Sequence, residues 1–300
     1  MTRVFVVLNP IAGQSNPEEI RSHLSAQIAA HGWESTIYQT NGDESDRARL
    51  KKAIASNYDL FIAAGGDGTV ALTATALIGT GLPLSILPTG TGNGVARAAG
   101  IPLDWREAAG LIFGEHQQYE FDAMEVAGQY FLLHLGVGLS GVALRQIDLE
   151  SKRRLGRLYY PFASLRALFG YQPHRFKLTI DGEDHTFKGT EVFIINSASM
   201  GDPFVRWSDS IKPTDGTLDV FLVRARTLTD FLRLAWNVVL GRQRLDPKVT
   251  YLLAHESIDV RTDPTLPLQG DGEFVTEEPF SVQLVAEAIK IIGPEQSAQM

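Results

Sequence analysis

Cysteine is absent from this chain of 300 residues, and its seven histidines are scattered, with no HxH or HxxxH pair among them. The lack of cysteine excludes disulfides, zinc ribbons, iron–sulfur clusters and thiol nucleophiles. The lack of paired histidines disfavours a histidine-based metal site. Carboxylates are therefore the side chains that are left to hold a metal or to move a proton.

Positive charge is also scarce, since 27 Lys and Arg stand against 35 Asp and Glu, for a formal net charge of −8. A chain this acidic has no overall attraction for nucleic acid or an anionic membrane, so we expect no nucleic-acid partner and only local contact with a membrane. Long apolar runs are missing too. The first, at 4–8, is too short for the core of a signal peptide, and the uncharged residues 68–96 include prolines and several glycines. We therefore expect a cytoplasmic protein.

The first 120 residues alternate short apolar segments with helical ones. Residues 4–8, 34–39, 59–64 and 83–87 are predicted strands, and helices are expected between them, over 45–56 and from about Thr69 and Gly92. Asn16 suits the N-cap of the first helix, with Pro17 at its first position and Glu19 placed for a capping box. This order predicts an α/β domain with a parallel sheet and helices on both faces, in which ligands bind beyond the carboxyl ends of the strands.

After Asp122 the pattern changes to short strand-like runs with turn dipeptides, which is typical of an antiparallel β-sandwich-like domain. The runs lie at 130–135, 176–180, 191–195, 218–223, 257–260 and 280–284, with helical stretches near 151–169 and 228–240. The apolar run 288–292 is expected to return to the first sheet. We therefore predict an α/β domain over 1–122 that residues 288–300 rejoin, and a β-rich domain over 123–287.

Two glycine-rich loops follow neighbouring predicted strands. The motif GGDGT at 65–69 opens a helix, and such a loop lets backbone amides approach a polyphosphate. Asp67 would repel phosphate unless a divalent cation lay between them, which points to a magnesium nucleotide. The alternative is a tight turn in which Asp67 caps the helix. Spacing argues against two other nucleotide motifs, because no acid follows Asp67 before Asp104, as a dinucleotide site needs, and no Gly-Lys pair exists for a Walker A loop.

The second loop, PTGTGNGVAR at 88–97, places the Thr91 hydroxyl beside the first loop, while Arg97 could contact phosphate or simply pack in its helix. Further motifs occur in order: NP at 9–10 before Gly13, Thr40 before Gly42 and Asp43, DGTLD at 215–219 and DGE at 271–273. In this combination the chain resembles the diacylglycerol kinase catalytic-domain family of soluble bacterial lipid kinases, which is related to sphingosine and ceramide kinases and shares the NAD kinase fold.

The resemblance implies an ATP- and Mg²⁺-dependent kinase that phosphorylates a lipid hydroxyl, with diacylglycerol and phosphatidic acid as the expected acceptor and product. Asp67 and Asp122 would hold the catalytic Mg²⁺ through water. A structural Mg²⁺ would bind the Asp215 carboxylate and the carbonyls of Lys212 and Thr217, although Asp215 and Gly216 also suit a type I turn. The implied nucleotide contacts are Asn9, Pro10, Gly13, Thr40, Gly65, Gly66, Asp67, Gly68, Thr69, Thr91 and Asn93.

The implied catalytic carboxylates are Asp271 and Glu273, which would reach the acceptor hydroxyl, together with Asp67; any of the three could be the base. The chain departs from the family pattern in two places. Val70, Ala71 and Leu72 follow the first loop where the family has a hydrophobic residue and then Asn-Glu, and Gly94 replaces an Asp. Two alternatives therefore stay open: a kinase of another lipid alcohol, such as a sphingoid base or phosphatidylglycerol, and a catalytically weak nucleotide-binding regulatory homologue.

A basic segment offers the local patch that membrane contact needs. Residues 145–177 hold eight Lys or Arg against Asp148 and Glu150, a net charge of +6, and aromatic residues are interleaved with them. The segment could dock on the inner membrane surface, or it could be a solvated helix face whose aromatics fill the β-domain. The oligomeric state stays open, a homodimer included.

Overall fold

A computed structural model describes residues 1–13, 15–145, 171–199, 207–208, 210–277 and 279–295. The contacts within the chain divide it into two units: unit 1 holds residues 1–122 and the described residues from 286 onward, and unit 2 holds the described residues between them. No helix in these ranges is long and apolar enough to cross a membrane. The expected helix at 151–169 and nearly all of the basic segment 145–177 lie outside the described residues.

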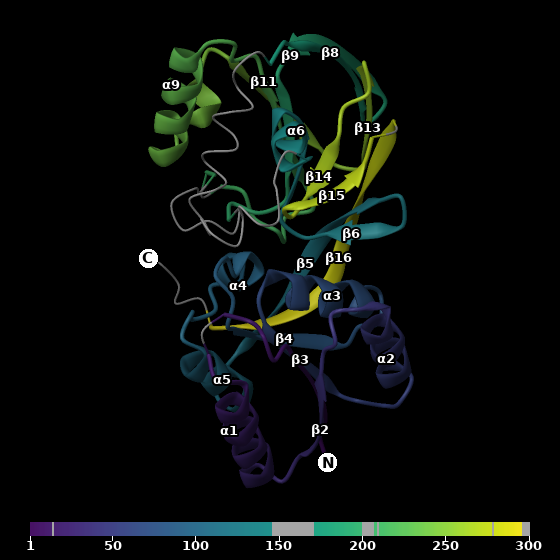
Figure 1. Cartoon of the computed structure of the whole chain (residues 1–300), viewed down its shortest axis with the longest axis vertical. Helices are drawn as coiled ribbons and strands as arrows, with labels where there is room; N and C mark the ends of the chain where they lie inside the picture. The colour runs from purple at the N-terminus through teal and green to yellow at the C-terminus, as the bar shows by residue number, and fades with distance from the viewer. Residues whose placement is uncertain (14, 146–170, 200–206, 209, 278, 296–300) are drawn as a thin grey trace. The chain divides into compact units, whose positions relative to one another are not determined.

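Unit 1 is built on a parallel sheet with helices on both faces (Figure 1). Strands β1 (Arg3–Leu8), β2 (Glu34–Gln39), β3 (Leu60–Gly65) and β4 (Pro83–Pro88) lie in the order β2-β1-β3-β4. Helices α1 (Pro17–Ala30) and α5 (Trp105–Phe113) cover one face, and α2 (Glu44–Ile54) and α3 (Asp67–Leu77) cover the other. The short α4 (Gly94–Ala98) follows β4, and β5 (Gln117–Val126) leads into unit 2.

The buried strands of this sheet are continuous apolar runs, as strands covered on both faces must be. Every residue of β3 is buried, whereas β2 at the sheet edge is half exposed. Asn16 caps α1, as predicted, by accepting the Glu18 N–H. The expected capping box was wrong: the Glu19 carboxylate pairs with Arg106 of α5, which ties the two helices on this face together.

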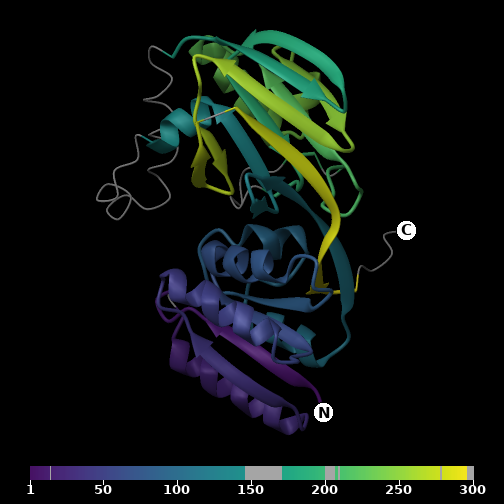
Figure 2. The ribbon, with the colours of Figure 1, turned by 90° about the vertical axis from the view of Figure 1, so that its right-hand side faces the viewer.

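Unit 2 consists of two antiparallel layers that enclose an apolar core (Figure 2). One layer contains β8 (His174–Ile180), β9 (Glu183–Gly189), β13 (Ser257–Asp263) and the first part of β16 (Phe280–Gly293), with β6 (Gln129–Phe131) on β5. The other has the order β12-β11-β10-β7-β14-β15. These strands are β7 (His134–Gly138), β10 (Glu191–Ile195), β11 (Leu218–Val223), β12 (Val249–Ala254), β14 (Leu268–Gly270) and β15 (Glu273–Thr276). Outside the layers lie α6 (Leu139–Arg145), α9 (Leu228–Val239) and the 3₁₀ turn η2 (Gln243–Leu245).

The predicted fold class, a parallel α/β part followed by an antiparallel β-sandwich-like part, is confirmed. The predicted strand at 130–135 is in fact two strands, β6 and β7, because the chain bends where the backbone N–H groups of residues 132–134 turn towards the Asp271 carboxylate. The run 288–292 does return to the first sheet, where Lys290 pairs with Pro83. It is continuous with the run 280–284 in β16, which is bent at Glu287, a residue with φ +51°.

Candidate active site

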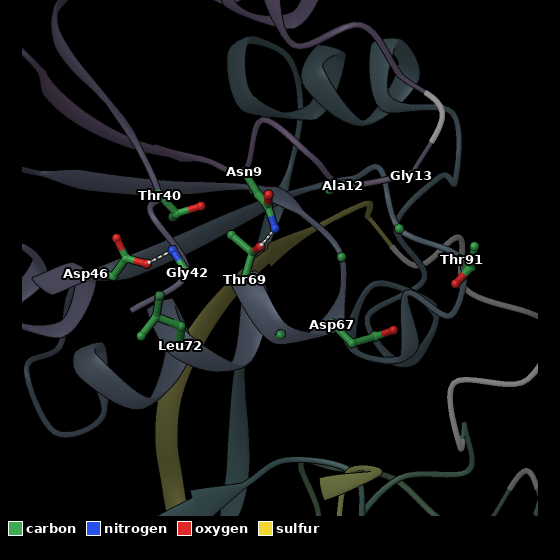
Figure 3. A pocket seen from close by; sticks show the side chains of 13 residues that line it. Asn9, Ala12, Gly13, Thr40, Gly42, Asp46, Asp67, Thr69, Leu72 and Thr91 are labelled. Carbon is green, nitrogen blue, oxygen red and sulfur yellow. Dashed lines mark hydrogen bonds between the residues drawn. The ribbon is translucent and has the colours of Figure 1, made fainter. Parts of the chain in front are cut away.

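A cavity of about 420 Å³ opens in unit 1 where β1, β3 and β4 end (Figure 3). This volume is typical of small-molecule sites. Eight of the predicted nucleotide contacts line it, and Pro10, Gly65 and Asn93 do not. The lining residues are Asn9, Ala12, Gly13, Thr40, Gly42, Asp46, Gly66, Asp67, Gly68, Thr69, Leu72, Gly90 and Thr91.

Most of the glycines here allow the loops to touch one another. A Cβ on Gly13, which has φ +61°, would lie 1.7 Å from the Thr89 carbonyl oxygen, and one on Gly90 would lie 2.4 Å from the Gly66 Cα. A Cβ on Gly68, by contrast, would meet no atom within 4 Å. Glycine-rich sequence therefore reflects backbone packing between the three loops as well as access for a ligand, and Gly68 is the glycine of GGDGT that leaves room on the cavity side.

The start of α3 supplies the cavity with free backbone donors. The Thr69 and Val70 N–H groups bond to the Gly66 carbonyl, and Gly66 at the N-cap offers no side chain to the others. Within the described part of the chain no acceptor bonds to the N–H groups of Asp67 and Gly68. Unsatisfied N–H groups at the positive end of a helix dipole are a binding site for anions such as phosphate.

Asp67 joins the two glycine-rich loops. One carboxylate oxygen accepts the Asn93 N–H at 2.9 Å, and the other accepts the Gly94 N–H at 2.6 Å. Asp67 therefore caps α4, which belongs to the second loop, and not its own helix. The same loop is closed by the Asn93 side chain, which accepts the Gly90 N–H and donates to the Gly90 carbonyl. Because a carboxylate has about four lone pairs, Asp67 keeps one on each oxygen for a further ligand.

Asn9 and Asp46 fix the opposite wall of the cavity (Figure 3). Asn9 donates from Nδ2 to Thr69 Oγ1 at 3.1 Å and accepts the Ile11 N–H. Asp46 accepts the Tyr38 hydroxyl at 2.6 Å and the backbone N–H groups of residues 41 and 42. Burial raises the pKa of Asp46, but these hydrogen bonds outweigh it and hold the pKa below its ordinary value. Asp46 is thus a buried anion whose lone pairs are largely used within the protein.

Sequence reasoning missed Asp46 because a carboxylate in the first turn of a helix looks like a solvent-facing residue. It also placed Asp122 beside Asp67 in a metal site. Asp122 is buried in β5, does not line the cavity, and accepts the Glu287 N–H at 2.9 Å, which fastens the bend of β16 to β5. No group of three or more acidic or histidine side chains with metal-ligand geometry occurs in the described residues.

In unit 2, Asp271 lies at the turn between β14 and β15 with φ +48°. Its carboxylate accepts the backbone N–H groups of Leu132, Leu133 and His134 at 2.9–3.2 Å, and its own N–H donates to the His134 carbonyl. The pKa of Asp271 is raised above its ordinary value, because the effect of burial outweighs that of these donors and of His134, which lower it. The Asp271 carboxylate therefore anchors the turn between β14 and β15 to the backbone at the start of β7.

His134 was not singled out in the sequence, yet its Nδ1 lies 3.8 Å from the Asp271 carboxylate. Burial lowers the pKa of His134, so the ring is neutral at neutral pH, and Nδ1 has no hydrogen-bond partner among the described residues. Glu273, two residues beyond Asp271, is exposed, and its carboxylate makes no hydrogen bond or ion pair within the described residues. The DGE motif thus holds one anchored carboxylate and one free carboxylate.

At the predicted structural Mg²⁺ site, the Asp215 carboxylate is bonded within its own turn. The Asp215 carboxylate is exposed and accepts both the backbone N–H and the hydroxyl of Thr217, at 3.1 and 2.8 Å, around Gly216 with φ +69°. These contacts make an Asx turn that needs no metal. Asp219, at the end of the same DGTLD motif, is buried and accepts Arg244 and the Tyr251 hydroxyl, so it joins β11 to β12 and η2.

Glu191 is a buried carboxyl that sequence reasoning also missed. It lies opposite Gly138 in the β7–β10 pair and accepts the Ser140 N–H at 2.8 Å, with the Ser140 hydroxyl at 2.5 Å. A Cβ on Gly136 or Gly138 would come within 3.1 Å of its carboxyl oxygens. Burial raises the pKa of Glu191 to about 8, so this group is a neutral acid at pH 7.

Replacing Glu191 by Gln is expected to flatten the pH dependence of stability. The pKa of about 8 in the folded chain lies above the ordinary value of a glutamate, so the unfolded chain loses a proton that the folded chain keeps. The free energy of unfolding of the parent protein therefore falls as the pH rises from 5 to 8, by about 1.4 kcal/mol per pH unit from this group. Urea denaturation at pH 5.5 and 7.5 should show that the free energy of unfolding of the variant, relative to that of the parent protein, is higher at pH 7.5. Glu183→Gln, at an exposed position of β9, is the control, and equal slopes for all three proteins would refute the assignment.

The similarity of this chain to known proteins extends over nearly its whole length. Residues 3–126 match the diacylglycerol kinase catalytic domain, and residues 135–293 match the YegS C-terminal NAD kinase beta sandwich-like domain. The diacylglycerol kinase of Bacillus subtilis (strain 168) is 26 % identical over 305 residues, which cover 100 % of this chain and 99 % of that one. The crystal structure of a diacylglycerol kinase from Bacillus anthracis str. Sterne has a TM-score of 0.79 and 27 % identity, covering 98 % of this chain and 97 % of that one.

A parallel α/β unit with glycine-rich loops at its strand ends, followed by an antiparallel sandwich, defines a two-domain kinase with the fold of the diacylglycerol and NAD kinases. The chain belongs to the diacylglycerol kinase catalytic-domain family. The resemblance noted in the sequence is thereby confirmed.

Proposed function

We propose that the protein transfers the γ-phosphoryl group of ATP to the hydroxyl of a lipid, with diacylglycerol as acceptor and phosphatidic acid as product. The observation that carries the proposal is the cavity at the strand ends of unit 1, where N–H groups at the start of α3 that have no acceptor among the described residues meet the Asp67 carboxylate. The amides suit the phosphates. The names of the relatives, diacylglycerol kinases among them, support a lipid acceptor.

Asp67 is the carboxylate that we assign to Mg²⁺. Of the two carboxylates that line the cavity, Asp46 has its lone pairs largely used by Tyr38 and backbone donors, whereas Asp67 keeps one on each oxygen. Oxygen ligands suit this cation, which binds through one or two carboxylates and retains waters. When bound, Mg²⁺ neutralises charge on the transferring phosphoryl group. Asn9, Thr40, Thr69 and Thr91 line the same cavity and supply neutral polar contacts for the nucleotide.

We assign the proton transfer to the DGE motif and divide its two carboxylates by their contacts. Asp271 is held by three backbone donors and positions the turn, while Glu273 is exposed and unpaired among the described residues and takes the proton of the acceptor hydroxyl. A positioned carboxylate base contributes about 10²–10⁴-fold, in addition to the alignment and charge neutralisation on which phosphoryl transfer mainly depends.

Labelled ATP tests the proposal directly. The full chain is incubated with γ-labelled ATP, Mg²⁺ and mixed micelles that contain diacylglycerol, a sphingoid base or phosphatidylglycerol, and the product is identified by mass spectrometry. We expect label in phosphatidic acid, and loss of the label when EDTA replaces Mg²⁺. Label in another lipid would correct the acceptor. ATP binding without incorporation into any lipid would overturn the proposal in favour of a regulatory nucleotide-binding protein, the alternative that Leu72 in the cavity wall keeps open.

A further inference from the structure

Helix α9 lies at the outside of unit 2 (Figure 1), and several of its apolar side chains are exposed. Leu228, Leu232, Trp236 and Val239 recur at helical spacing, and Leu240 follows, with between 45 % and 64 % of each exposed. Leu245 in η2 extends this set and is 79 % exposed. We call these six residues the α9 stripe. Single exposed apolar residues are ordinary, but a row of large ones on one helix face marks a surface that meets an apolar partner.

The polar side of α9 holds the helix in this orientation. Asp246, which is 2 % exposed, accepts Asn237 Nδ2 at 2.7 Å and Arg233 Nε at 3.1 Å. Asp230 and Thr227 form a capping box at the start of the helix. Rotating the helix to bury the stripe would break these bonds and leave the buried Asp246 carboxylate without them, which is costly. The outward direction of the stripe is therefore built into the packing of the helix.

The charge around the stripe is positive in a chain that is acidic overall. Residues 224–248 contain six Lys or Arg against Asp230 and Asp246, a net charge of +4. Both of these carboxylates are buried and bonded to Arg233, whereas Arg226 and Arg242 are exposed and form no ion pair among the described residues. The exposed Leu and Trp side chains of α9 are thus flanked in the chain by an exposed Arg before the helix and another after it. Exposed apolar side chains with cations close to them in the sequence are the composition of a helix that lies in the interface of an anionic bilayer.

We infer that the α9 stripe and the cations beside it are a docking surface for an anionic lipid bilayer, with Leu232 and Trp236 entering the interface. Charge favours a bilayer over two other occupants, which are a second copy of this chain and residues 146–170 of the same chain. A second copy would bring a surface of the same positive sign against the first. Residues 146–170 hold five Lys or Arg against two carboxylates, a net charge of +3 in the sequence, so they too would be repelled. This inference goes beyond the proposed function, because binding to a bilayer can be measured without ATP or turnover.

Sedimentation with sucrose-loaded vesicles tests the docking surface. The full chain is mixed with vesicles of phosphatidylcholine alone or with one quarter phosphatidylglycerol. We expect the double variant Leu232→Gln/Trp236→Gln to bind the anionic vesicles at least about tenfold more weakly than the parent protein. We expect Arg226→Glu/Arg242→Glu to lose the preference for anionic over neutral vesicles. The matched control is Leu103→Gln/Leu253→Gln, which removes two leucines that are 40 % and 44 % exposed, one in the loop before α5 and one in β12.

Two further measurements keep these results interpretable. Circular dichroism melting should show an unchanged midpoint for the Leu232 and Trp236 variant, and a blue shift of tryptophan fluorescence on vesicle binding should disappear in Trp236→Phe. Binding equal to that of the parent protein would overturn the inference. A lowered melting midpoint of the Leu232 and Trp236 variant would also overturn it, because it would mean that the chain itself covers the stripe. So would a loss of dimers in light scattering with unchanged vesicle binding, which would identify a second copy as the occupant. Failure of the lipid-phosphorylation assay would leave the vesicle result standing.

Discussion

Replacing Asp67 by Asn is expected to lower the rate of phosphoryl transfer by about a thousandfold or more, because it removes the charge that we assign to Mg²⁺ at the cavity. The same change has a structural cost. One of the two acceptors for the Asn93 and Gly94 N–H groups becomes an amide nitrogen, which faces a donor. Loss of such a cap destabilises by about 0.5–2 kcal/mol. The loss of activity should therefore be far larger than the loss of stability can explain.

Asp104→Asn is the matched control for this variant. Asp104 caps α5 through one oxygen, Oδ1, which accepts the N–H groups of both Arg106 and Glu107, and it does not line the cavity. An amide oxygen can keep both of these bonds, so we expect Asp104→Asn to retain its free energy of unfolding in urea titrations and its turnover. Asp67→Asn should lose a small part of the former and nearly all of the latter. Near-parent turnover of Asp67→Asn would remove the metal assignment and leave Asp67 as a cap between the two loops.

The cavity shows which parts of a site can be predicted from sequence. Strands β1, β3 and β4 of unit 1 were placed to within about one residue because each is an apolar run that ends at a turn motif, and those ends fix where Asn9, Asp67 and Thr91 meet. The direction of each carboxylate could not be predicted. Asp67 bonds to residues 26 and 27 positions away, and Asp122 to one 165 positions away, so their partners depend on tertiary packing.

Buried polar groups in unit 2 were missed for a related reason. Glu191 begins a predicted strand and His134 lies inside another, and nothing in their own segments distinguishes them from exposed residues. Their environment comes from the register, which places Glu191 opposite Gly138 and His134 opposite Ile195 on the face of the sheet away from the sandwich core. A shift of one residue in this pairing would exchange the two faces, so alternation alone gives too little information to assign them.

The two carboxylates of the DGE motif are expected to differ in what their replacement costs. Glu273→Gln should lower kcat by about 10²–10⁴-fold, the usual contribution of a general base, with an unchanged melting midpoint, since the exposed Glu273 side chain makes no bond within the described residues. Asp271→Asn should lower both activity and stability, because an amide can accept fewer of the three backbone N–H groups that now bond to Asp271. The cost of leaving buried donors unpaired is about 1–3 kcal/mol each.

The chain supplies its own control for this experiment. Asp181 also has φ +48°, precedes a glycine, and accepts three consecutive backbone N–H groups, those of His255, Glu256 and Ser257. Asp181→Asn should therefore lose stability in the same direction as Asp271→Asn, by a smaller amount because Asp181 is exposed to water, yet keep its kcat. If Glu273 is the base, Glu273→Gln should lose kcat at an unchanged melting midpoint, while Asp271→Asn should lose no more activity than its loss of stability explains. The opposite pattern, with Glu273→Gln fully active and Asp271→Asn inactive beyond its loss of stability, would transfer the role of base to Asp271.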